Sequence, residues 1–106
     1  MMPGITPSLL LTGAPAITGW VNPGSAAWNG ETLNYWTDLY AEHTGGTAPF
    51  TYAWSSDGFS VTIDNPALRL ARFRSSDGSA AAVECLITDA LGQQVTISGT
   101  ILGVVT

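Results

Sequence analysis

The stretch Phe50-Thr51-Tyr52-Ala53-Trp54 decides the fold class of this chain. Its aromatic side chains recur at every second position, which is the period at which a β-strand turns successive side chains to one face. Small or polar residues fill the positions between them, so the pattern predicts a half-buried strand with Trp54 in the core. Turn sequences flank the stretch, with Gly45-Gly46 before it and Ser55-Ser56-Asp57-Gly58 after it.

The same alternation appears further along the chain, over residues 61–63, 83–87 and 95–97, and the end at 101–105 also favours a strand. Turn sequences rich in Asp, Asn and Gly separate these runs, which predicts an all-β sandwich or barrel. Two segments fit strand and helix about equally. We interpret residues 31–43 and 67–73 as strands from their alternation, with a helix near 35–40 as the alternative.

Composition excludes several classes of protein. The 106 residues carry eight acidic and three basic side chains, for a net charge of −5, and they include no lysine. A nucleic-acid-binding domain or a domain that adheres to an anionic membrane needs more cations. Hydrophobic residues make up 45% and charged residues 10%, so we expect one folded domain whose weakly charged surface packs against other proteins.

Sorting and redox signals are sparse. The N-terminus lacks the basic region and the long apolar run of a secretory signal, and no run reaches the roughly 20 apolar residues of a membrane helix. Cys85 is the only cysteine, so an internal disulfide is impossible. We therefore expect the protein to stay in the compartment where it is made.

Residues 1–30 differ from the rest of the chain. They hold four of the six prolines, and the first charged residue is Glu31. Proline removes the donors that strand pairing needs, which predicts an extended N-terminal arm with at most short edge strands, followed by a sandwich domain over 31–106. The arm is rich in apolar side chains, so it needs cover from its own domain or from a partner.

Two motifs resemble the PKD-like and bacterial immunoglobulin-like domains. The first is the Gly-Gly-x-x-Pro turn at 45–49 that leads into the aromatic strand, and the second is Val83-x-Cys85-x-Ile87-x-Asp89-x-x-Gly92. The resemblance covers about residues 31–106 and implies a seven-stranded β-sandwich. It implies that Trp54 lies in the core and that Cys85, where immunoglobulin domains carry their second cysteine, is a buried free thiol.

The chain has few residues that could catalyse a reaction or bind a metal ion. His43 and Cys85 are the only histidine and the only cysteine, too few for a zinc site and an unfavourable pair for nucleophilic catalysis. Some PKD-like domains bind calcium through loop carboxylates. The loop aspartates of this chain form no dense cluster, and turn stabilisation explains each one (Asp57, Asp64, Asp77, Asp89). We expect neither an enzyme nor a cofactor.

Two groups of side chains are candidates for binding. Tyr35, Trp36 and Tyr40 are the candidates for a platform on which sugars stack, and the alternative is that such rings pack in the core or at an interface. Arg69, Arg72 and Arg74 carry all the positive charge of the side chains. They suit either bidentate pairing with carboxylates of a neighbouring protein or balancing of acids on the same domain.

The leading hypothesis is a non-enzymatic structural protein of a phage virion, most specifically a capsid decoration protein. Virion proteins are made in the host cytoplasm and released by lysis, which reconciles an immunoglobulin-like sandwich with the lack of an export signal. The expected partner is the major capsid protein or another virion protein, with a homo-oligomer possible. Contacts are expected from Leu9, Leu10, Leu11, Trp20 and Trp28. Alternatives are a carbohydrate- or cell-surface-binding module and a tail or neck component.

Overall fold

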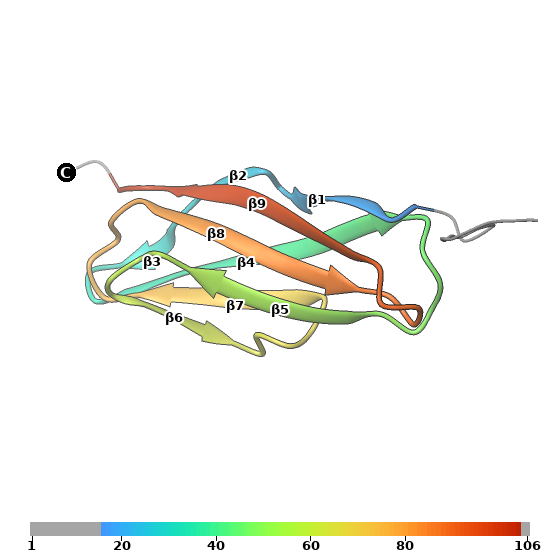
Figure 1. Cartoon of the computed structure of the whole chain (residues 1–106). Coiled ribbons are helices and arrows are strands. Elements are labelled where there is room, and N and C mark those ends of the chain that lie inside the picture. The colour runs from blue at the N-terminus through green and yellow to red at the C-terminus, as the bar shows by residue number, and fades with distance from the viewer. Residues whose placement is uncertain (1–15, 105–106) are drawn as a thin grey trace, which may run out of the picture.

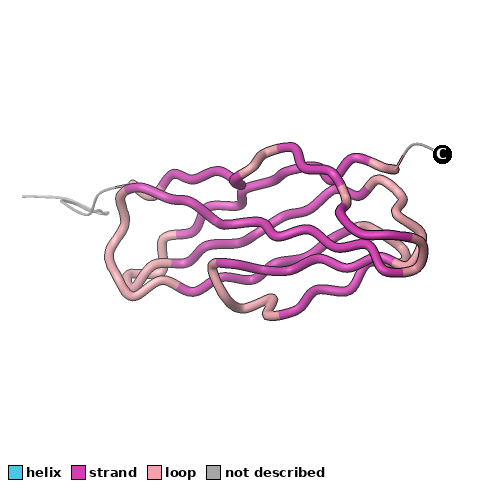
Figure 2. The backbone as a smooth tube through the Cα atoms, turned by 180° about the vertical axis from the view of Figure 1, so that it is seen from behind, coloured by secondary structure: helices cyan, strands magenta, loops and turns pink. Residues whose placement is uncertain are grey.

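The computed structural model describes residues 16–104 as two β-sheets packed face to face, with no helix in this range (Figures 1 and 2). The strands are β1 (Thr18–Asn22), β2 (Ser25–Ala27), β3 (Asn29–Glu31), β4 (Asn34–Thr44), β5 (Thr51–Ser56), β6 (Val61–Asp64), β7 (Leu70–Ser75), β8 (Ala81–Thr88) and β9 (Gln94–Leu102). The expected all-β sandwich is confirmed. Within the described range there is no helix that could cross a membrane.

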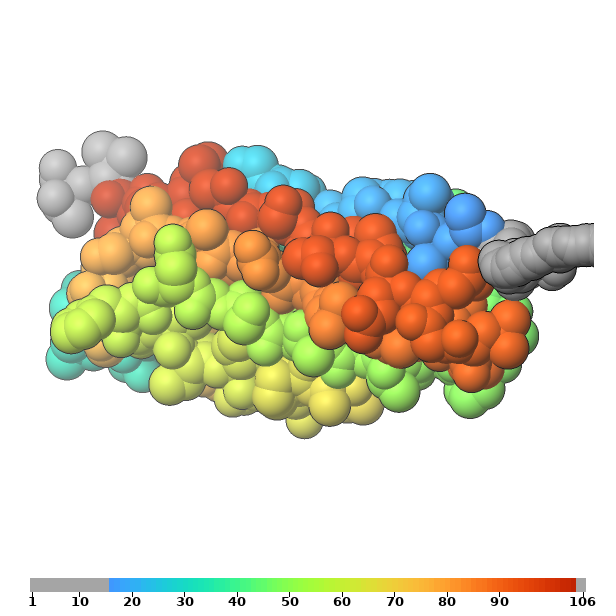
Figure 3. Space-filling view, viewed as in Figure 1, coloured from blue at the N-terminus to red at the C-terminus, as the bar shows by residue number. Residues whose placement is uncertain are grey.

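Each sheet mixes strands from distant parts of the chain. Sheet A has the order β1-β4-β7-β6, with β3 beside the start of β4, and sheet B has the order β2-β9-β8-β5. Neighbouring strands are antiparallel except β2 and β9, which run parallel. Figure 3 shows the outer face of sheet B, where β5, β8 and β9 meet solvent.

The expected boundary between arm and sandwich at residue 30 is wrong. β1 pairs with β4 from Thr18↔Thr44 to Asn22↔Tyr40, and β2 pairs with β9 in the other sheet. Of the nine strands in the described residues, six (β4 to β9) lie within 31–104, whereas seven were expected from residue 31 onward. The physical reason is burial, because Ile17, Val21 and Trp28 complete the core. Residues 1–15, with Leu9 to Leu11, lie outside the described residues.

Both ambiguous segments contain strands. Residues 34–44 form β4 and residues 70–75 form β7, so the helical alternative is wrong. In β4 the buried side chains Thr37, Leu39 and Ala41 alternate with outward ones, and β7 buries Ala71 and Phe73 in the same way. The period of two favours strand over helix in both segments, because it gives each strand one apolar face that the core can bury.

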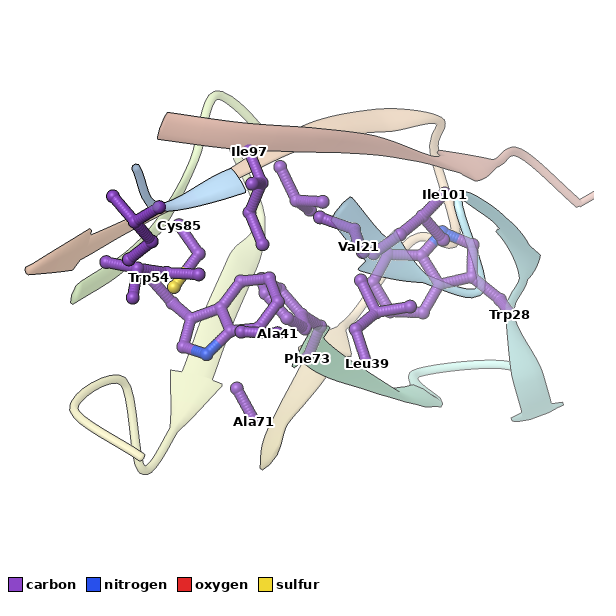
Figure 4. Close-up of a cluster of buried hydrophobic side chains, with 13 residues drawn as sticks. Val21, Trp28, Leu39, Ala41, Trp54, Ala71, Phe73, Cys85, Ile97 and Ile101 are labelled. Carbon is purple, nitrogen blue, oxygen red and sulfur yellow. The ribbon is translucent and has the colours of Figure 1, made fainter. Parts of the chain in front are cut away.

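The core runs the length of the sandwich, with Trp54 and Trp28 toward its two ends (Figure 4). Each buried indole nitrogen donates a 2.8 Å hydrogen bond, from Trp54 to the Leu68 carbonyl and from Trp28 to the Ser79 carbonyl. Trp54 also packs edge-on against Phe73, with ring centroids 5.5 Å apart. Burial of Trp54 and of the free thiol of Cys85 confirms both expectations.

Several loop carboxylates accept hydrogen bonds from backbone N–H groups. Asp89 accepts hydrogen bonds from the N–H groups of Thr47, Leu91 and Gln93, which ties two loops together. Asp77 accepts bonds from the Ser79 N–H and from serine hydroxyls. Within residues 16–104 no group of three or more His, Cys, Asp or Glu side chains is arranged to hold a metal ion.

Candidate functional site

The outer face of sheet A gathers most of the aromatic and charged candidates. Because β4 buries its odd-numbered side chains from 37 to 41, it turns Trp36, Asp38 and Tyr40 outward. β7 turns Arg72 and Arg74 outward for the same reason. The sequence pattern therefore builds this face from two central strands, with β1 and β6 beside them.

Strand register sets which side chains meet on the face. Trp36 lies opposite Arg74, and Asp38 lies opposite Arg72. On the neighbouring edge strand, Asp64 of β6 also lies opposite Arg72. Cross-strand partners on one face are close enough for their side chains to touch, so the register places carboxylates next to the arginines.

All three arginines pair with carboxylates of this chain. Arg72 binds Asp38 through two bonds, Nε to Oδ1 at 2.7 Å and Nη2 to Oδ2 at 2.9 Å. Arg74 donates from Nε to Asp64 at 2.6 Å, and Arg69 pairs with Glu42. Of the two uses expected for the arginines, the structure therefore shows pairing with acids of the same domain.

These contacts hold the carboxylates in their charged form. Hydrogen bonding from Arg72 lowers the pKa of Asp38, and burial only partly opposes it. A hydrogen bond from the Asn22 amide, followed by the bond from Arg69, lowers the pKa of Glu42. At neutral pH the face therefore presents neutral ion pairs instead of free cations.

Two of the arginines also cover aromatic rings. The guanidinium carbon of Arg72 lies 4.3 Å from the centroid of the Trp36 ring, and that of Arg69 lies 5.4 Å from the centroid of Tyr40. Both distances lie within the range of a cation–π contact. Because Asp38 and Glu42 fix the two arginines, both rings are held in place by a stacked and paired cation.

An apolar patch occupies the part of the face nearer β1. It consists of four side chains that are exposed by 51%, 41%, 56% and 38%, and we call it the Trp20 patch (Trp20, Tyr40, Leu68, Leu70). Tyr40 and Leu70 are cross-strand partners, and Asn22, two residues after Trp20, lies opposite Tyr40. Exposed aromatic rings beside paired arginines are the composition favoured at protein interfaces.

A hollow of about 570 Å³ opens on the other part of the face, over the end of β7. We call it the Trp36 hollow, and it is lined by Leu33, Asn34, Tyr35, Trp36, Ser60, Thr62, Arg74, Ser75 and Ser76. It lies between β4 and β6, and hydroxyl, amide and guanidinium groups surround the half-buried ring of Trp36. The geometry combines an apolar surface with several hydrogen-bonding groups.

Comparison with known proteins gives one structural neighbour. No family model and no curated protein matches this chain. A solved structure is similar over 84% of this chain and 26% of its own, with a TM-score of 0.64 and 15% identity. It is described as a nucleoside hydrolase-related hypothetical protein from Saccharophagus degradans that is associated with carbohydrate metabolism. At this identity the similarity shows the fold alone, and the chain spans about a quarter of that protein.

The structure brings most of the candidate residues together on one face. Trp20, Trp36, Tyr40 and the three arginines share the outer face of sheet A (Arg69, Arg72, Arg74). Trp28 does not belong to it, because its ring is buried in the core, and its assignment to partner binding is wrong. Tyr35 is half-buried at the wall of the hollow.

Sequence reasoning missed the carboxylate partners and two leucines of this face. The signal that could have found the carboxylates is the even spacing of Asp38 and Glu42 from Trp36, which places all three on one face of a strand. It did not indicate which arginine each acid meets, because that depends on the register between distant strands. The alternation of Leu68 and Leu70 against Ala71 and Phe73 separates the two leucines from the buried side, but it does not show that they stay exposed.

The Cys85 thiol and the His43 ring, which were considered for nucleophilic chemistry, both have structural roles. Burial raises the pKa of the Cys85 thiol to about 11, which keeps it in the unreactive protonated form. The Nε2 atom of His43 lies 3.0 Å from the Tyr52 hydroxyl, and its ring packs on Phe50 with centroids 4.1 Å apart.

Proposed function

We propose that this chain is a non-enzymatic structural protein of a phage virion, most specifically a capsid decoration protein that docks through the outer face of sheet A. The observation that carries the proposal is the Trp20 patch, where Trp20, Tyr40, Leu68 and Leu70 stay exposed beside arginines already paired within the chain. Leu9 to Leu11 extend this contact in the proposal.

The proposal includes an immunoglobulin-like, PKD-like fold. Its support is the strand order β1-β4-β7-β6 against β2-β9-β8-β5, because immunoglobulin domains distribute their strands over two sheets in this way. Trp54 lies directly opposite Cys85 on neighbouring strands. In antibody domains a buried tryptophan packs against the cysteine of the corresponding strand.

The absence of a disulfide suits assembly in the host cytoplasm. Immunoglobulin domains outside cells use a second cysteine to link their sheets, whereas this chain has Cys85 alone. Its core is closed by Ile17, Val21 and Trp28 instead. A sandwich that folds without oxidation can assemble on a shell before lysis, where we place this protein.

Docking through the Trp20 patch follows from its chemistry. Tryptophan, tyrosine and arginine dominate the binding energy of protein interfaces, and the patch presents the first two next to Arg69 and Arg72. The arginines are already neutralised, so the contact is expected to depend weakly on salt. The proposed partner is the major capsid protein, or a second copy of this chain on the shell.

Co-sedimentation with empty shells tests the proposal. The shells are assembled from the major capsid protein encoded in the same genome, and the full chain is expected to sediment with them. The double variant Trp20→Ser, Leu70→Ser is expected to bind about tenfold more weakly or worse. Leu102→Ser is the matched control, because Leu102 is as exposed as Trp20 but lies at the end of β9 in sheet B.

Three results would contradict this proposal. A genome without a capsid gene, or full-length protein that stays in the supernatant, would remove the decoration role. Sedimentation with tails but not with shells would make the protein a tail or neck component. Equal binding by the patch variant and the Leu102 control would place the interface elsewhere.

A further inference from the structure

The Trp36 hollow is separate from the Trp20 patch. Tyr40, Leu68 and Leu70 do not line it, and its walls come from the start of β4 and from β6. Its floor is the end of β7, at Arg74 and Ser75. The outer face of sheet A therefore holds an apolar surface and a mixed one. A further hollow of about 360 Å³ adjoins both, because it shares Leu68 and Leu70 with the patch and Arg74 with the Trp36 hollow.

The aromatic ring of the hollow is held in place before any ligand arrives. Arg72 stacks on Trp36 and is itself fixed by two hydrogen bonds to Asp38. Trp36 lines the hollow and Arg72 does not, so the hollow reaches this ring without being lined by the arginine that stacks on it. A ring with a fixed orientation loses little entropy when a ligand stacks on it.

Polar groups surround this ring without adding net charge. Asn34, Thr62 and Ser76 contribute amide and hydroxyl groups, and no carboxylate lines the hollow. Arg74 is balanced by Asp64 through its Nε. Among residues 16–104 the terminal amino groups of Arg74 make no hydrogen bond, so they are available as donors.

We propose that the Trp36 hollow binds an uncharged glycan, with one sugar ring stacked on Trp36 and its hydroxyls bonded by Arg74, Asn34 and Thr62. A sugar ring has an apolar face of C–H groups, which the electron-rich face of an indole attracts. The hydroxyl groups around the edge of the sugar ring need hydrogen-bond donors and acceptors beside the indole. A volume of about 570 Å³ lies within the range of small-ligand sites and accommodates a ligand of one or two rings.

Charge favours this class over phosphorylated ligands. A phosphate-binding site uses cations that are free to pair with the ligand, whereas the arginine of this hollow already has a carboxylate partner. An acidic polysaccharide is disfavoured for the same reason, because Arg74 is already neutralised by Asp64. The hydroxyl-rich wall instead fits a ligand whose polar groups are themselves hydroxyls.

This site is independent of docking on a virion. The particle test depends on Trp20 and Leu70, whereas the glycan site depends on Trp36, Arg74 and the polar wall. Loss of one interaction with retention of the other would therefore show which of the two proposals is wrong.

Affinity electrophoresis of the full chain tests the glycan site. The gels contain soluble neutral polysaccharides with glucan, mannan, galactan or xylan backbones, and further gels contain polygalacturonate. At least one neutral polysaccharide is expected to retard the wild-type protein. Trp36→Ala is expected to weaken that binding about tenfold or more, by the energy of stacking on an aromatic ring, while Trp20→Ala binds like wild type.

Thr62→Val is the second variant, because it removes a hydroxyl of the wall on an exposed position of β6 and keeps a β-branched side chain. It is expected to weaken retardation without changing the thermal unfolding midpoint, which guards against misfolding of the Trp36 variant. Failure of every neutral polysaccharide to retard the wild-type protein overturns the proposal. Retardation by polygalacturonate alone, or retardation that folded Trp36→Ala retains, overturns it as well.

Discussion

Arg72 lies over Trp36 with its guanidinium carbon 4.3 Å from the ring centroid, while both of its bonding nitrogens engage Asp38. The three side chains come from two neighbouring strands of sheet A. The arrangement links an ion pair to the orientation of a half-buried indole. Its main effect is therefore on how firmly Trp36 is held, because an ion pair this exposed contributes little to stability.

Asp38→Asn is expected to loosen Trp36 without unfolding the protein. Arg72 then loses its anionic partner, so the cation that covers the ring is less well fixed. The pair is 39% and 33% exposed, and the free energy of unfolding should fall by less than about 1 kcal/mol. Relaxation of the Trp36 indole N–H in NMR should show larger amplitudes of motion.

Glu42→Gln is the control for this effect, because it releases Arg69 over Tyr40 and leaves Arg72 and Asp38 intact. It should not change the relaxation of the Trp36 indole. Equal mobility of Trp36 in wild type and Asp38→Asn would show that the ion pair does not orient the ring.

Trp54, Trp28 and Trp20 are expected to separate into two classes on replacement by alanine. Trp54 and Trp28 are buried and hydrogen-bonded, so each change should cost about 3–5 kcal/mol of unfolding free energy. Trp20 is half-exposed, and its loss should cost less than about 1 kcal/mol. Urea unfolding measures all three, and a cost below 1 kcal/mol for Trp54 would contradict its place in the core.

The alternating strands were predictable from sequence because each pattern is local. Residues 50–54 and 83–87 alternate over at least five positions, and a half-buried strand is the structure that separates their faces. Both lie in sheet B as neighbouring strands. The same reasoning predicted a strand over residues 31–43, where Tyr35, Leu39 and Ala41 occupy odd-numbered positions, and β4 covers 34–44.

Strands β1, β2 and β3 were not predictable in the same way. Pro23 and the surrounding glycines divide this segment into strands of five, three and three residues, and none of these strands alternates apolar with polar side chains. Their pairing depends on the distant strands β4 and β9. The burial of Trp28 was missed for this reason.

The contacts of the candidate site depend even more strongly on the register between β4 and β7. Arg72 and Asp38 are 34 positions apart, and a single sequence does not fix how β4 and β7 align. Part of the composition of the face follows from the even spacing of Trp36, Asp38 and Tyr40 once residues 34–44 are known to form a strand. Its ion pairs and its hollow became visible only in three dimensions.

Cys85 is expected to resist thiol reagents in the native protein. It is fully buried, and burial raises its pKa to about 11, so the reactive thiolate is scarce at neutral pH. Modification by a chromogenic disulfide should be slow in buffer and fast in denaturant. Equal rates in the two conditions would place the thiol at the surface.

Stability is expected to fall in acid partly through Asp77. Bonds from the Ser79 backbone N–H, then from the Ser60 and Ser75 hydroxyls, lower its pKa from 3.8 to about 2. Because the folded pKa is the lower one, its contribution is present above pH 4 and is lost as the pH falls toward 2. Asp77→Asn should weaken the pH dependence of the urea midpoint in this window, and an unchanged dependence would contradict the role given to these bonds.

Two truncations distinguish the sandwich from the segment before it. Removal of residues 1–30 deletes β1, β2 and most of β3 and takes Ile17, Val21 and Trp28 from the core. The remaining chain should lose its cooperative urea transition, because uncovered apolar surface costs about 25 cal/mol per Å². Removal of residues 1–15 keeps all of these strands and should leave a cooperative transition. If the chain that lacks residues 1–30 still unfolds cooperatively at the urea midpoint of the full-length protein, the first strands do not belong to the folded unit.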